Sequence, residues 1–118
     1  MRIVEIRTYK LKPGTAPQFL DAFQHALPLL RDSGMDIVAF GRSDHEHESF
    51  FLVRAYSDRV ALEEQQNAFY SSARWRNGPR GPLVACIDEY LNTLLWMPDQ
   101  AVEDLRHCNG LDGPQRIG

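Results

Sequence analysis

This sequence has little of what usually marks a catalytic or nucleic-acid-binding class. Its two cysteines, Cys86 and Cys108, form neither a metal-binding spacing nor a disulfide framework. No apolar run approaches the roughly 18 residues of a membrane span. The net charge is −3 and lysine and arginine form no block, so the chain is not expected to bind nucleic acid or a membrane. The charged, alternating N-terminus is unlike a signal peptide, and we expect a cytoplasmic, reduced protein.

Motifs for phosphate binding, nucleophilic catalysis and metal binding are missing too. The glycines occur singly, which excludes a phosphate-cradling loop. No serine or cysteine stands in a nucleophile elbow or beside a candidate base. His45 and His47 alternate and can point the same way, but a zinc site needs a third ligand. We interpret this pair as a solvated hairpin tip and expect no metal and no cofactor.

What the sequence does contain is the patterning of one globular domain, with 43% hydrophobic and 25% charged residues. Strict alternation predicts a strand over Arg2–Leu11, and Gly34–Tyr56 has the pattern of a hairpin with a charged tip. Phe19, Phe23 and Leu30 recur at helical spacing, in a helix that Thr15 is expected to cap together with Gln18. The other predicted elements are helices over residues 59–68, 73–77 and 100–107, a helical segment from Pro82 and a strand over residues 89–97.

The order strand, helix, strand, strand, helix, strand predicts an α+β fold. It is the ferredoxin-like plait, β-α-β-β-α-β, with an antiparallel four-stranded sheet and its helices on one face. We expect residues 1–97 to form this domain and residues 98–118 to form a C-terminal short helix and tail.

Strand alternation divides the predicted sheet into two faces. The face expected to meet the helices carries small and aliphatic side chains, namely Val4, Ile6, Ile37, Ala39, Phe51, Val53, Ala55, Leu91 and Leu95. The opposite face carries Glu5, Arg7, Tyr9, Phe40, Arg42, Arg54, Tyr56, Asn92 and Trp96. Because aromatic groups and arginines mix on that face, we expect it to be covered by a second subunit, in a homodimer that encloses a cavity.

The residues on that mixed face resemble a known family. Three short patterns are involved, Glu5-x-Arg7-x-Tyr9, Phe40-Gly41-Arg42 and Arg54-x-Tyr56, followed by Phe69-Tyr70-x-x-x-x-Trp75-Arg76-Asn77-Gly78-Pro79. Together they resemble the NIPSNAP family over about Met1 to Met97. The resemblance implies the dimeric α/β barrel fold with a central cavity. The wider superfamily includes cofactor-free monooxygenases, EthD-like proteins, haem-binding decarboxylases and small binding domains, so the resemblance implies no single mechanism.

The candidate ligand-binding residues are Arg7, Tyr9, Phe40, Arg42, Arg54, Tyr56, Trp75 and Trp96. Arginine offers a fixed donor fork for carboxylates and enolates. Three arginines beside Glu5 leave an excess of positive charge, which favours an anionic or carbonyl-bearing ligand. The alternative is structural, with the arginines in ion pairs between subunits and the aromatic groups packed in the dimer core.

Three functions remain open from the sequence. The first is a homodimeric protein that binds a small anionic or aromatic molecule in its cavity. The second is a cofactor-independent monooxygenase or isomerase, in which Arg7 and Arg54 stabilise an enolate and Tyr9 or Tyr56 relays a proton. The third is a purely structural dimer.

Overall fold

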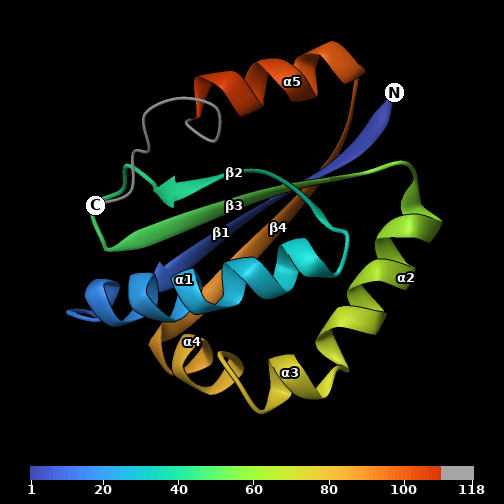
Figure 1. The fold of residues 1–118 in the computed structure, drawn as a ribbon. Coiled ribbons are helices and arrows are strands. Elements are labelled where there is room, and N and C mark those ends of the chain that lie inside the picture. The colour runs from blue at the N-terminus through green and yellow to red at the C-terminus, as the bar shows by residue number, and fades with distance from the viewer. Residues whose placement is uncertain (110–118) are drawn as a thin grey trace.

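The computed structural model describes residues 1–109. In chain order its elements are β1 (Arg2–Leu11), α1 (Ala16–Asp32), β2 (Asp36–Arg42), β3 (Ser49–Tyr56), α2 (Arg59–Tyr70), α3 (Ala73–Arg76), α4 (Arg80–Cys86), β4 (Ile87–Met97) and α5 (Asp99–Cys108). The four strands form one antiparallel sheet in the order β2-β3-β1-β4 (Figure 1). This confirms the predicted α+β, ferredoxin-like arrangement. The predicted tail beyond Asn109 lies outside the described residues.

The start of α1 differs from the predicted capping box. The Thr15 hydroxyl donates to the Lys12 carbonyl oxygen at 2.6 Å and makes no cap hydrogen bond to the helix. The Glu48 carboxylate, at the end of the β2–β3 hairpin, instead accepts from the backbone N–H groups of Gly14 and Ala16. A carboxylate stabilises a helix N-terminus because the first N–H groups lack partners within the helix. A residue far along the chain therefore caps α1.

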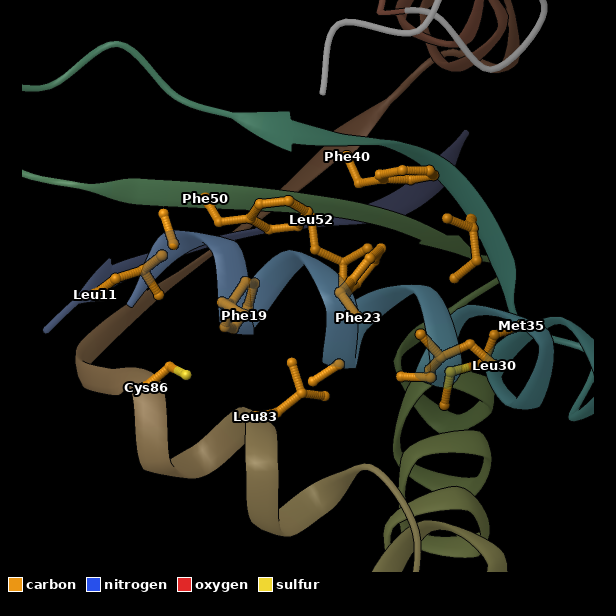
Figure 2. Packing of buried hydrophobic residues seen from close by; sticks show 14 of the residues in the cluster. Leu11, Phe19, Phe23, Leu30, Met35, Phe40, Phe50, Leu52, Leu83 and Cys86 are labelled. Atoms are coloured by element: carbon orange, nitrogen blue, oxygen red, sulfur yellow. The ribbon is translucent and has the colours of Figure 1, made fainter. Parts of the chain in front are cut away.

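The face of the sheet that the long helices cover is the one that we expected to face a second subunit. Phe40, Phe50 and Leu52 belong to a buried cluster in which α1 supplies Phe19 and Phe23 (Figure 2). Helix α4 closes this cluster from outside (Figure 2). The prediction that the small aliphatic face meets these helices is therefore wrong. Alternation separates two faces but does not say which of them a helix covers, and here the aromatic side chains of α1 pack on aromatic partners.

The aliphatic face has a different cover. Helix α5 lies on the side of the sheet opposite to α1 (Figure 1), and its Val102 is fully buried against Val4 and Val53. The pairing of β2 with β3 shifts between Ile37 and Ala39, which places Ile37 in the aromatic cluster and Ala39 in the aliphatic one. We had assigned both residues to one face, because simple alternation cannot anticipate a bulge.

Strand β4 is the edge strand next to β1 and is unusually open. All of its residues from Asp88 to Trp96 are exposed, including Leu91 at 69% and Trp96 at 53%. Its neighbour β1 pairs Glu5 with Arg54 on one side, and Arg7 with Asn92 of β4 on the other. This register gathers charged and polar groups at the centre of the helix-covered face. Among the described helices, none is long and apolar enough to cross a bilayer.

Candidate functional site

A cavity of ≈ 140 Å³ lies between the sheet and the helices that cover it. Its walls are mainly aromatic and aliphatic, and its polar groups are Arg7 and Tyr9 from β1, Tyr70 from α2 and Tyr90 from β4. Trp75 of α3 closes one side, with its ring 5.4 Å from that of Tyr70 and 5.3 Å from that of Phe69. A larger surface hollow of ≈ 870 Å³ lies between α1 and the loop near Pro79, but no arginine lines it.

Glu5 is the centre of a buried polar network beneath this cavity. Its side chain is 1% exposed, and that of Arg54 is 0% exposed. Arg54 donates through Nε to Glu5 Oε1 at 2.8 Å, and its Nη2 lies 2.6 Å from the same oxygen. The other oxygen, Oε2, accepts from Arg7 Nη2 at 3.2 Å, Gln66 Nε2 at 3.0 Å and Asn92 Nδ2 at 2.9 Å. Side chains from β1, β3, β4 and α2 are thus tied to one carboxylate.

The charges of the network do not cancel. Burial by itself would raise the pKa of the Glu5 carboxyl, but the Arg54 and Arg7 guanidiniums hold that pKa below its usual range. Burial would lower the pKa of Arg54, whereas its neighbours Tyr70, Tyr56 and Glu5 raise it. At neutral pH the network therefore holds two guanidinium charges and one carboxylate charge, an excess of one positive charge.

Tyr70 connects the buried network to the cavity. Arg54 Nη1 donates to the Tyr70 hydroxyl at 2.8 Å, while Tyr70 also lines the cavity. The site residues predicted from the sequence did not include Tyr70, although it belonged to the pattern that resembled the family. Gln66 stands four residues before it on α2, and residues at this spacing share one face of a helix. The spacing of Gln66 and Tyr70 is the feature of the sequence that could have indicated that both side chains reach the sheet.

Arg7 is the charged group at the cavity wall. Its Nε donates to Asn92 Oδ1 at 2.7 Å, and its guanidinium carbon lies 4.9 Å from the centre of the Tyr90 ring. Its side chain is 13% exposed. Burial would lower the pKa of Arg7, but Tyr9, Tyr70 and Glu5 raise it, and burial raises the pKa of the Tyr9 phenol. Arg7 is therefore a permanent cation beside the neutral phenol of Tyr9.

The other candidate residues predicted from the sequence lie at different places in the structure and do not line the cavity. Tyr56 is buried behind the network and accepts from Gln66 Nε2 at 3.1 Å. Phe40 lies in the core, with its ring 5.1 Å from that of Phe23. Arg42 is exposed at the end of β2, and Trp96 is exposed on β4. Of the eight candidates, Arg7, Tyr9 and Trp75 line the cavity and Arg54 supports it from below.

The two histidines of the hairpin tip lie away from this cavity. Their ring centres are 5.2 Å apart, and His45 Nδ1 lies within hydrogen-bonding distance of the Ser43 and Ser49 hydroxyls. Within residues 1–109, no group of three or more histidine, cysteine, aspartate or glutamate side chains is placed to hold a metal ion.

Chemically, the described walls of the cavity offer hydrogen-bond donors, one cation and aromatic surface. They contain no carboxylate, imidazole or thiol, the usual general bases at neutral pH. Glu5 lies nearby, but its oxygens are occupied by four donor side chains and its pKa is lowered. The arrangement is suited to holding a negative charge and not to removing a proton from carbon.

Solved structures of the same fold come from several bacteria. An uncharacterised NIPSNAP-like domain protein from Burkholderia xenovorans superposes with a TM-score of 0.76 at 18% identity, covering 83% of this chain and 86% of that chain. A NIPSNAP family protein from Agrobacterium tumefaciens has the same TM-score at 17% identity, with coverages of 83% and 87%. A protein described as a putative antibiotic biosynthesis monooxygenase from Bordetella bronchiseptica has a TM-score of 0.66 at 22% identity, with coverages of 82% and 97%.

At these identities the structural likeness shows the fold. No functionally curated protein matches the chain significantly. The sequence model of the NIPSNAP family, however, matches residues 4–95, which span β1 to β4 and contain all the residues of the network and the cavity. The chain therefore belongs to the NIPSNAP family.

Proposed function

We propose that this protein binds a small, planar aromatic molecule with a single negative charge in the cavity between β1 and the helices. The observation that carries the proposal is the excess of one positive charge at the polar end of an aromatic cavity. Among residues 1–109, Glu5 is the acidic group that pairs with Arg7 and Arg54. An uncompensated charge at a poorly hydrated site is costly, and an anionic ligand would remove that cost.

The size and lining of the cavity support this ligand class. Its volume of ≈ 140 Å³ is close to the roughly 150 Å³ of an engineered apolar cavity that holds benzene. Aromatic walls from Phe19, Phe23 and Trp75 are suited to the faces of a flat ring. The ligand class therefore follows from two features, a space for about one ring and a cation at one end.

The proposal includes a homodimer. The support is the open edge strand β4, whose exposed large side chains are Tyr90, Leu91, Leu94, Leu95 and Trp96. A run of exposed aromatic and aliphatic groups of this kind is typical of a protein–protein interface, and a second copy of the chain is the partner that a symmetric assembly supplies. Free thiols at Cys86 and Cys108 agree with the reducing cytoplasm that we propose as its location.

Tryptophan fluorescence tests the binding proposal directly. The Trp96→Phe variant leaves Trp75, in the cavity wall, as the single tryptophan. Titration with benzoate, phenol and para-nitrophenol is expected to change its emission with a saturable dependence. Val84→Phe, at the exposed mouth of the cavity, should weaken binding at least about tenfold, a difference of about 1.4 kcal/mol. The matched control is Val60→Phe, exposed on α2 and away from the cavity.

Two results would overturn the proposal. One is an unchanged Trp75 emission with all three probes, together with native mass spectra in which the purified protein carries no small molecule. The other is equal binding by Val84→Phe and Val60→Phe, which would place the probe elsewhere. The first result would favour a purely structural role for the protein.

A cofactor-independent oxygenase is the second candidate. The observation in its favour is the Tyr70 hydroxyl, a donor beside Arg7 at the end of an apolar cavity, which suits an oxyanion that forms during a reaction. Two neighbours by fold are described as putative antibiotic biosynthesis monooxygenases. Consumption of dioxygen in the presence of an electron-rich phenol tests this candidate, and consumption that survives Tyr70→Phe unchanged would contradict it. The isomerase alternative has no support, because the cavity walls supply no base.

A further inference from the structure

The inference concerns the acid–base state of the ligand, and it rests on the proposed binding function. We propose that the cavity selects weak acids that ionise at a single oxygen, namely phenols and enols. It holds them in the ionised form between Arg7 Nη1 and the Tyr70 hydroxyl. The proton of the acid passes to water on binding, and no bond other than the O–H bond of the ligand is broken.

The first argument is that the edge of the Arg7 guanidinium formed by Nε and Nη2 is already occupied. Nε donates to Asn92 at 2.7 Å and Nη2 donates to Glu5 at 3.2 Å. A carboxylate is bound best by two parallel N–H groups on adjacent guanidinium nitrogens. Asn92 and Glu5 do not use Nη1. The Tyr9 phenol is a third hydrogen-bond partner of the Arg7 guanidinium, and a ligand would share that guanidinium with it. A single-oxygen anion needs only one donor from Arg7 and one from Tyr70, so it loses nothing from the occupied Nε–Nη2 edge.

The second argument is the direction of the Tyr70 proton. A guanidinium nitrogen is a donor only, so in the 2.8 Å contact between Arg54 Nη1 and Tyr70 the phenol oxygen must accept. The O–H bond of Tyr70 must then point elsewhere. Within the described residues no protein group accepts from it, and the side chain lines the cavity. Tyr70 therefore offers a hydrogen bond that the positive charge on Arg54 strengthens.

The third argument is electrostatic. The titratable groups that face the site are Glu5, Arg7 and Tyr9 from β1, Arg54 and Tyr56 from β3, Tyr70 from α2 and Tyr90 from β4. Among them the two arginines and Glu5 are charged at neutral pH, with a net charge of +1. A fixed cation next to a poorly solvated ligand favours its ionised form and lowers its pKa. Because the walls hold no base, the ligand must be acidic enough for solvent to take its proton.

The experiment uses para-nitrophenol, whose ionised form is yellow and whose neutral form is not. The full-length protein is titrated into the probe at about one unit below the pKa of the free probe, where roughly a tenth of it is ionised. Wild-type protein is expected to raise the phenolate absorbance to a plateau and to lower the apparent pKa of the probe by at least about one unit. Tyr70→Phe removes the hydroxyl alone and should reverse most of this shift. Arg7→Met should abolish it, whereas Arg59→Met, exposed on α2, should retain it.

Two further probes separate this inference from the binding proposal. The isosteric para-nitroanisole cannot ionise, and para-nitrobenzoate carries a two-oxygen anion. If para-nitrobenzoate quenches Trp75 with a saturable dependence and para-nitrophenol gives no growing phenolate band, the inference is overturned while the proposal that the cavity binds an aromatic anion stands. If para-nitrobenzoate binds as tightly as the phenolate, the single-oxygen selectivity is overturned. If none of the probes alters Trp75 emission, the binding proposal fails and this inference fails with it.

Discussion

Replacing Glu5 by glutamine is expected to destabilise the folded protein by about 3–5 kcal/mol, the usual cost of breaking a buried ion pair from one side. The side chains of Glu5 and Arg54 are 1% and 0% exposed, and their closest atoms are 2.6 Å apart. Glutamine keeps the shape of the side chain but removes its charge. Arg54 would then remain buried with hydrogen-bond partners such as the Tyr70 hydroxyl but without a counter-charge.

The expected size follows from the number of donors that converge on this carboxylate. Arg54 donates to one oxygen, and Arg7, Gln66 and Asn92 donate to the other. A glutamine has one acceptor oxygen, and its amide N–H₂ would face donors on the other side. Each buried donor that loses its acceptor costs about 1–3 kcal/mol. An exposed ion pair would be worth about 1 kcal/mol or less, so the two cases are clearly separated.

Urea unfolding at neutral pH, followed by circular dichroism, measures the effect. The matched control is Glu63→Gln on the exposed side of α2, which should change the free energy of unfolding by about 0.5 kcal/mol or less. A double-mutant cycle with Arg54→Met isolates the interaction between the two charges. The double variant should be more stable than the sum of the two single effects implies, by at least about 1 kcal/mol, because it no longer buries an unpaired charge.

A cost below about 1 kcal/mol for Glu5→Gln would refute this reasoning. It would mean that Glu5 is solvated or already protonated in the folded protein. If Glu5 is protonated, the excess beneath the cavity would be two positive charges in place of one. If the changes in the free energy of unfolding caused by Glu5→Gln and Arg54→Met were additive, the two side chains would not interact measurably, which would also refute this reasoning.

Three further results are expected. The folded-state pKa of Glu5 is lowered, so its contribution to stability is complete above its unfolded pKa of about 4.3. This contribution is lost as the pH falls through the folded-state pKa. The melting temperature of the wild type should therefore drop below about pH 4 more steeply than that of Glu5→Gln. Leu91→Asp on β4 should shift a dimer toward monomer in light scattering, while Val60→Asp should not, and a wild-type monomer would contradict the proposed interface. Gly78→Ala places a Cβ 2.5 Å from the Arg74 carbonyl oxygen and should cost about 1–3 kcal/mol in urea unfolding; no measurable loss would show that the α3–α4 turn yields.

Local patterns in the sequence were enough to predict most of the elements. Alternation placed β1 at Arg2–Leu11, and the first helix and the second were predicted to begin at Ala16 and Arg59, where α1 and α2 begin. Asp58, directly before α2, caps it: its side chain accepts from the backbone N–H of Ala61 at 2.8 Å. These features depend on residues within a turn or two of each other, so their physical causes can be read along the chain.

The sequence by itself determined the order of the elements, the family and the presence of arginines and phenols on one face of the sheet. The tertiary structure decided which face the helices cover, where the phase of β2 breaks, and which arginines become buried. It also brought together Glu5 and Asn92, which are 87 positions apart, and placed Tyr70 against Arg54. Alternation divides a strand into two faces but does not say which face is buried by helices. Here the packing of Phe19 and Phe23 of α1 against the aromatic side chains of the strands determines which face the helices cover.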